Sequence, residues 1–79
     1  MSKTQDLFFD IFSTTAGIPL EELTPDATLE SLEVDSLLLI ELTVAVQKRV
    51  GVVIEEADLA PEATLGEIVT LLDKQLQEA

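Results

Sequence analysis

Hydrophobic residues return every three or four positions in three stretches of the sequence. These stretches cover about residues 4–15, 36–50 and 65–77. Such spacing is typical of a helix that buries one of its faces. Gly17 and Gly51 follow the first two stretches, and glycine commonly ends a helix. The pattern therefore predicts three main helices.

Two short motifs indicate where helices begin. Ser2-Lys3-Thr4-Gln5 and Thr64-Leu65-Gly66-Glu67 both fit the capping box, in which Ser or Thr and a Glu or Gln three positions later cap the first turn. Residues 25–29 and 61–65 also resemble each other, reading Pro-Asp-Ala-Thr-Leu and Pro-Glu-Ala-Thr-Leu. An internal repeat is one explanation. Because the flanking residues do not match, we favour two helical turns that begin with the same chemistry.

The connections between the stretches are rich in apolar residues. Residues 17–35 contain Pro19 and Pro25, which disfavour helix, and also four leucines: Leu20, Leu23, Leu29 and Leu32. A long loop of this composition is expected to pack over the core. Residues 52–54 fit a short strand or an extended buried connector, and without a partner strand we prefer the connector. Residues 55–59 fit one short helical turn.

These elements predict an all-α fold with three main helices, one short helix and a long first loop. Residues 1–79 are expected to form a single domain, near the lower size limit for a self-sufficient core. The sequence has no cysteine and no histidine, so disulfides and the usual soft metal sites are excluded, and we expect no metal.

The charge balance excludes several classes of partner. There are 16 acidic and 4 basic residues, giving a net charge of −12, whereas nucleic acids and anionic membranes need a basic footprint. The acidic residues either solvate the surface or steer the protein toward basic partners. No apolar run approaches membrane-spanning length, and the first residues lack the apolar segment of a signal peptide. We therefore expect a soluble, cytoplasmic monomer.

An enzyme is a poor interpretation of this sequence. Ser36 stands at the start of the second predicted helix, but no histidine exists and no nearby lysine can activate it. Paired carboxylates of the glycosidase type need a large cleft, which 79 residues hardly supply. No segment has the spacing of a calcium-binding EF-hand loop.

The second predicted helix is apolar on two sides. One stripe, the predicted core side, consists of Leu39, Leu42, Val46 and Val50. The opposite side carries Leu37, Ile40 and Val44 together with Glu41 and Lys48. A small domain cannot bury both sides completely, so the second stripe is either covered by the long loop or exposed to a partner. We favour a docking face beside the serine.

The segment Leu29-Glu30-Ser31-Leu32-Glu33-Val34-Asp35-Ser36-Leu37 resembles the attachment motif of the acyl carrier protein family. The bare Asp-Ser-Leu is also ordinary helix-cap chemistry. However, the length, the acidity, the missing cysteines, the long first loop, Glu41, Gly51 and the closing Thr-Leu-x-Glu-Ile run are similar to the family as well. The resemblance covers essentially the whole chain and implies a four-helix acyl-carrier bundle.

The resemblance also implies a function. Ser36 would accept 4′-phosphopantetheine from coenzyme A through a phosphopantetheinyl transferase, and acyl groups would be carried as thioesters on that arm. Asp35 would support the transfer, although a role as helix cap or first-turn anion explains it equally well. Partners such as the transferase, a ketosynthase and an acyltransferase would contact Leu37, Ile40, Glu41 and Val44. Leu39, Val46 and Ile54 would line an acyl site, or simply belong to the core.

Departures from the family pattern bear on the pathway. Fatty-acid carriers usually place acidic residues where this sequence has Leu38, Gln47 and Lys48, and glycine where it has Glu33. This less acidic helix favours a carrier of polyketide or related secondary metabolism, such as antibiotic biosynthesis. Type II fatty-acid synthesis is the alternative. An interaction module of another class, whose serine is only a cap, would tolerate Ser36→Ala and take up no arm.

Overall fold

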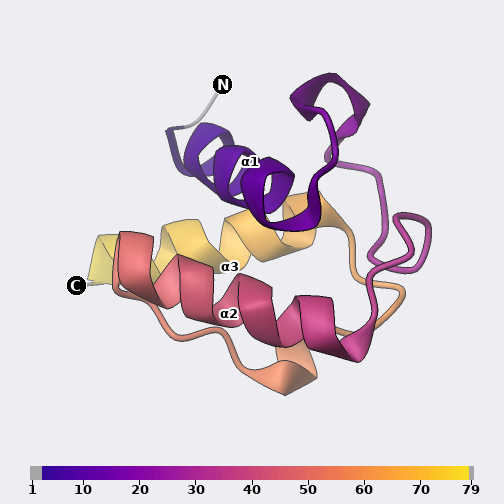
Figure 1. The fold of residues 1–79 in the computed structure, drawn as a ribbon. Coiled ribbons are helices and arrows are strands. Elements are labelled where there is room, and N and C mark those ends of the chain that lie inside the picture. The colour runs from indigo at the N-terminus through magenta and orange to yellow at the C-terminus, as the bar shows by residue number, and fades with distance from the viewer. Residues whose placement is uncertain (1–2, 79) are drawn as a thin grey trace.

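In the part of the chain that the structure describes, three α-helices and two single-turn 3₁₀ helices make up the fold (Figure 1). The computed structural model describes residues 3–78, apart from the side chains of Glu56 and Glu78. In chain order the elements are α1 (Lys3–Ala16), η1 (Leu20–Glu22), α2 (Ser36–Val50), η2 (Glu56–Asp58) and α3 (Leu65–Glu78). The predicted all-α class, with three main helices and a short fourth element, is confirmed. The turn η1 inside the first loop was not predicted.

The aromatic residues of α1 lie at the centre of the core. Phe8 and Phe12 are almost completely buried, and their rings meet edge to face with centroids 6.0 Å apart. Such a geometry adds to the burial of the two rings. The helix ends where predicted, because Gly17 has a φ of +71° and its N–H donates to the Ser13 carbonyl at 2.9 Å. Glycine adopts this left-handed conformation without steric cost.

The predicted capping box of α1 is only partly visible, since Ser2 lies outside the described residues. Thr4, the third residue of that motif, is buried and donates from its hydroxyl to Asp73 Oδ1 of α3 at 2.7 Å. An ion pair of 3.6 Å joins Arg49 of α2 to Asp10 of α1. Both of its side chains are 53% exposed, so the pair contributes at most about 1 kcal/mol. The packing of apolar faces therefore holds the helices together.

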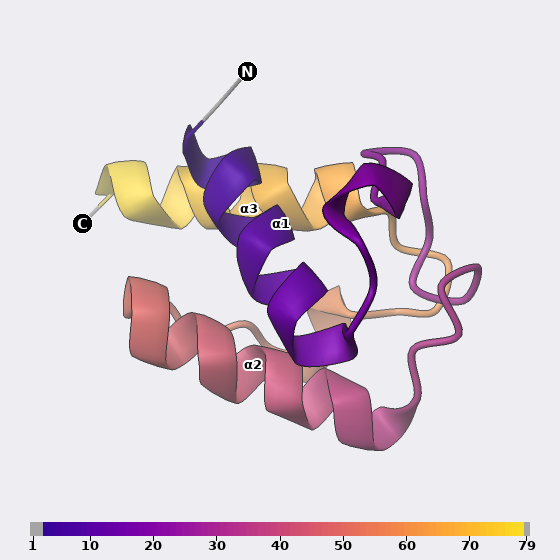
Figure 2. The same cartoon turned by 45° about the horizontal axis from the view of Figure 1, so that its top comes forward.

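Helix α1 lies across α2 and α3 and contacts both (Figure 2). The core takes residues from all three helices and from both long connections. Its fully buried members include Phe8, Ile11, Phe12, Leu29, Val46, Leu65, Ile68 and Leu72. Leu23 and Leu29 show that the first loop packs over this core, as predicted, whereas Leu20 is 51% exposed. The segment after α2 is an extended connector in which Val52 and Ile54 are buried and Val53 is exposed.

The two similar segments, residues 25–29 and 61–65, are paired with each other. An isolated antiparallel bridge joins Thr28 to Thr64. The backbone bonds are reciprocal, with N–H of one segment donating to C=O of the other in both directions. These are Leu29 to Ala63 at 3.1 Å, Leu65 to Ala27 at 2.9 Å, Glu30 to Pro61 at 2.9 Å and Gly66 to Pro25 at 2.9 Å. The pairing fixes the first loop to the start of α3.

Both paired segments begin a helical turn, as we predicted. Thr64 and Glu67 form the predicted capping box, with the Glu67 N–H donating to Thr64 Oγ1 at 3.1 Å and the Thr64 N–H to Glu67 Oε1 at 3.3 Å. In the first loop, Thr28 and Ser31 exchange the same two bonds at 3.0 Å. The Thr64 turn continues into α3, whereas the Thr28 turn ends at Glu33, which has a φ of +59°. That reversal directs the chain into α2.

Candidate functional site

Helix α2 begins with two adjacent residues that do different things. Asp35 is extended, and its carboxylate accepts a hydrogen bond from the Leu38 N–H at 2.8 Å, so Asp35 is the N-cap. Ser36 is the first residue of the helix and is exposed. The idea that Ser36 caps the helix is therefore wrong, because the neighbouring carboxylate already occupies that role. The serine hydroxyl is not required for the helix to start.

The backbone dipole of α2 favours an anion near Ser36, whereas the adjacent Asp35 carboxylate opposes one. The N-terminus of a helix carries a partial positive charge, which stabilises nearby negative groups by about 0.3–1 kcal/mol at an exposed site. At the other end, Lys48 and Arg49 complement the partial negative charge of the last turn. Gly51 closes the helix with a φ of +79° and an N–H bond to the Gln47 carbonyl at 2.9 Å. A phosphate group on Ser36 would thus lie at the favourable end.

The loop segment that leads to Ser36 is attached to the core by Leu29. Leu29 is 1% exposed, and its carbonyl accepts a hydrogen bond from the Val34 N–H at 3.1 Å. Between them, Glu33 has the left-handed backbone conformation, with a φ of +59°. This conformation disfavours a residue with a Cβ by about 1–2 kcal/mol. Despite this strain, Asp35 and Ser36 lie at the surface.

A pocket of about 310 Å³ opens beside Ser36. Its wall consists of side chains from α2 and from the connector around η2: Ser36, Leu39, Ile40, Thr43, Ile54 and Leu59. Two of the three residues predicted to line an acyl site, Leu39 and Ile54, are in this wall. Val46 is not in this wall, and its complete burial agrees with the alternative that it belongs to the core.

Sequence reasoning missed two residues of this wall. Thr43 follows Ser36 by seven residues, which is two helical turns, so helical spacing alone could have placed it on the same side. Its hydroxyl donates to the Ile40 carbonyl at 2.8 Å, which satisfies the group within its own helix. Leu59 comes from the connector after η2, and no local pattern in the sequence indicates that it meets α2.

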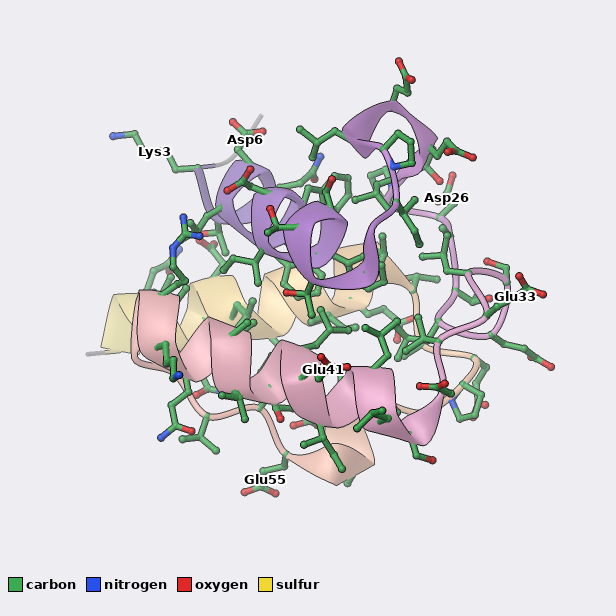
Figure 3. The ribbon with its side chains drawn as sticks, viewed as in Figure 1. Lys3, Asp6, Asp26, Glu33, Glu41 and Glu55 are labelled. Atoms are coloured by element: carbon green, nitrogen blue, oxygen red, sulfur yellow. The ribbon has the colours of Figure 1, made fainter. Side chains whose placement is uncertain are left out.

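The outward side of α2 is open. Leu37 is 66% exposed, Ile40 60% and Val44 44%, so the first loop does not cover this stripe. Glu41 is exposed as well, and Figure 3 shows it on the side of α2 that faces the viewer. The alternative that the loop buries the second stripe is wrong, because the loop is tied to the start of α3 instead.

The charged residues are unevenly distributed. Figure 3 shows Asp26 and Glu33 at the end of the molecule formed by the first loop, and Lys3 at the opposite end. The sequence has no basic residue between Lys3 and Lys48, so the whole approach to Ser36 is acidic or neutral. Within the described residues, no group of acidic side chains is arranged to hold a metal ion. None of the helices described is long and apolar enough to cross a membrane.

Comparison with known sequences gives the family. A sequence profile described as "Phosphopantetheine attachment site" matches residues 6–72, which include Asp35, Ser36 and Leu37. The chain belongs to the acyl carrier protein family. It is 34% identical to the meromycolate extension acyl carrier protein of Mycobacterium leprae over 70 residues, covering 87% of this chain and 61% of the relative. It therefore spans about three fifths of the length of that relative.

Two shorter members of the acyl carrier protein family match over most of their own length. The acyl carrier protein of Thermobifida fusca is 32% identical over 66 residues, covering 82% of this chain and 84% of the relative. That of Thermotoga maritima is 31% identical over 80 residues, covering 96% and 99%. The prosthetic group of the acyl carrier protein family is 4′-phosphopantetheine, and family members carry acyl groups rather than catalyse their conversion. An exposed serine at the positive end of a helix, beside an apolar pocket, fits that group.

Proposed function

We propose that this chain carries acyl intermediates on a 4′-phosphopantetheine arm attached to Ser36. In this proposal residues 1–79 act as one monomeric, cytoplasmic carrier domain, which is itself a substrate of a phosphopantetheinyl transferase. One observation carries the assignment to Ser36. This serine is exposed at the first position of α2 while Asp35 caps the helix, so the hydroxyl can be modified without loss of the cap.

The chemistry of attachment explains why no base stands near Ser36. In the transfer, a bond forms between Ser36 Oγ and the phosphorus of the arm, and the pyrophosphate bond of coenzyme A breaks. The transferase takes the serine proton and binds the leaving nucleotide, so the carrier needs no histidine or lysine of its own. The arm supplies the thiol that holds acyl groups as thioesters. The carrier residues position the hydroxyl, with Asp35 fixing the turn from which it projects.

The pocket beside Ser36 is the candidate site for the proximal part of the acyl chain. Its wall is mostly apolar, and the Thr43 hydroxyl is already bonded within α2. The apolar residues that line the space are Leu39, Ile40, Ile54 and Leu59. An apolar chain in such a space is removed from water, which is favourable at about 0.8 kcal/mol per buried methylene. The pocket opens at the residue to which the arm is attached, so cargo can enter without passing through the core.

The outward side of α2 is the candidate docking face for the enzymes that act on the arm. Its residues are Leu37, Ile40, Glu41 and Val44, which begin one residue after Ser36. An exposed apolar stripe of this kind on a small protein is typical of an interaction surface. The transferase, a ketosynthase and an acyltransferase are the partners that we expect there.

Two pathways remain candidates, and each has a specific observation in its favour. The neutral and apolar α2, with Gln47 and Lys48 near its end, supports a polyketide-type carrier. The relatives named for meromycolate extension support a carrier of fatty-acid-type chain elongation. Rates of acyl transfer to polyketide-type and fatty-acid-type ketosynthases would separate the two, because only one class should accept the loaded carrier efficiently.

Intact mass spectrometry tests the proposal. The purified chain and its Ser36→Ala variant are incubated with coenzyme A and a broad-specificity phosphopantetheinyl transferase. We expect the wild type to gain one phosphopantetheine and the variant to gain none. If neither gains mass although circular dichroism shows both to be folded, the carrier role is wrong and an acidic interaction module is the better account.

A further inference from the structure

A second concave surface lies between the end of α1 and the outward side of α2. It is a groove of about 540 Å³. Its walls include Thr14 and Thr15 from α1 and Ile40, Glu41, Val44 and Lys48 from α2. The groove starts about four residues after Ser36, or about 6 Å along the helix axis, so a protein seated in it is close to the attachment site. We call this surface the α1–α2 groove.

The α1–α2 groove carries opposite charges at its two ends. Glu41 and Lys48 are seven residues apart, which places them on the same side of α2 and about 10 Å apart along the axis. Val44 lies between them along the helix and is an apolar residue of the groove wall. The neighbouring Arg49 is paired with Asp10, whereas Lys48 is exposed in the groove wall. Glu41 is the end nearer to Ser36.

Building on the proposed function, we propose that the enzymes acting on Ser36 dock an apolar segment in the α1–α2 groove, with a basic group opposite Glu41 and an acidic group opposite Lys48. A partner that fills the groove removes water from both charges, and a charge left without a partner weakens binding. The order of charges also sets the direction of docking, because the basic group must lie at the end nearer to Ser36.

Lys48 is then a specificity-determining residue. The net charge of −12 attracts basic proteins over long distances. At contact, however, a uniformly basic surface pairs with Glu41 but is repelled at Lys48. Discrimination between related partners often depends on one such repulsive contact. The groove should therefore favour partners of mixed charge over partners whose docking surface is basic throughout.

Charge reversal at Lys48 tests the proposal, because the proposal predicts slower rather than faster modification of Ser36. With a transferase that modifies the wild type, kcat/KM for modification is measured for Lys48→Glu and for Lys74→Glu, an exposed position on α3. Both variants change the net charge equally. We expect Lys48→Glu to be modified roughly three- to tenfold more slowly than Lys74→Glu, chiefly through KM, with the difference shrinking at high salt. Equal rates, or faster modification of Lys48→Glu, would overturn the proposal.

A steric pair tests the contribution of α1. Thr14→Trp places a large side chain at the wall of the groove, and Thr70→Trp places the same side chain on an exposed position of α3. We expect slower modification for Thr14→Trp only. If both tryptophan variants match the wild type, α1 is not part of the docking surface and the proposal is wrong. A wild type that gains no arm under any condition refutes the carrier role itself, whereas equal modification of all variants refutes the groove alone.

Discussion

The two sides of α2 differ in what surrounds them. On the inner side, Leu42 and Val46 are at most 3% exposed and pack among the phenylalanines of α1 and the apolar residues of α3. On the outer side, Leu37 and Ile40 are at least 60% exposed, although they are no less hydrophobic. Composition therefore cannot tell a core stripe from a docking stripe within one helix. The decisive difference is where the first loop goes, and its pairing with the start of α3 leaves the outer side free.

The largest effect on the free energy of unfolding is expected from a substitution on the inner side of α2. Leu42→Ala removes a buried side chain that the surrounding helices cannot fully replace, so we expect the free energy of unfolding to fall by about 2–5 kcal/mol. Ile40→Ala is the matched truncation on the outer side and should change it by no more than about 0.5 kcal/mol. Urea unfolding measures both. The reverse ranking would show that the two sides of α2 are misassigned.

Asp35 and Ser36, at the start of α2, also differ in how much they contribute to stability. Asp35→Ala removes the N-cap and leaves the Leu38 N–H without its acceptor, which should lower the free energy of unfolding by about 1 kcal/mol. Asp35→Asn is the control, since an asparagine oxygen can accept the same hydrogen bond. Thermal or urea unfolding of the three proteins is the measurement. Equal loss in both variants would mean that the charge, rather than the cap, stabilises the helix.

A substitution at Glu33 is expected to relieve backbone strain in the loop that leads to Ser36. Glu33 is the residue with a φ of +59°, so Glu33→Gly should raise the free energy of unfolding by about 0.5–1 kcal/mol, after allowance for the greater freedom of glycine in the unfolded chain. Urea unfolding again serves as the measurement. A loss of stability would show that the Glu33 side chain contributes more than its backbone conformation removes.

The smallest expected effect is at the candidate attachment residue. Ser36→Ala should change the free energy of unfolding by no more than about 0.5 kcal/mol, because Ser36 is exposed and Asp35 provides the cap. A loss near 1 kcal/mol or more in urea unfolding would return Ser36 to a structural role. Together with the Asp35 variants, this result separates the residue that starts the helix from the residue that is left available.

Local patterns in the sequence predicted the local parts of this structure. The helical period and Gly51 placed α2 at residues 36–50, the bounds that the structure has, and the Thr64 box correctly placed the start of α3. These features depend on residues at most four apart, so they are readable without knowledge of the fold. A small domain cannot bury both sides of α2, so size alone favours an exposed outer stripe.

The structural features that could not be predicted from the sequence depend on contacts between distant residues. Pairing of residues 25–29 with 61–65 joins segments 36 positions apart, and their similarity alone did not indicate that they meet. Leu59 reaches the pocket beside Ser36 only because the connector returns past α2. Asp35 and Ser36 are both residue types that cap helices, so propensity cannot tell which of the two is the N-cap. The answer depends on a shift of one position in the start of α2.

The most direct test of the account compares two exposed residues with the same chemistry and different places. Ile40 is 60% exposed on the outer side of α2, and Val53 is 59% exposed on the connector. Ile40→Glu and Val53→Glu are compared with the wild type for the free energy of unfolding and for kcat/KM of Ser36 modification by a phosphopantetheinyl transferase. We predict that both variants remain folded and that only Ile40→Glu is modified several-fold more slowly. Equal modification of the two folded variants would contradict the claim that the outer side of α2 is the docking face of this carrier.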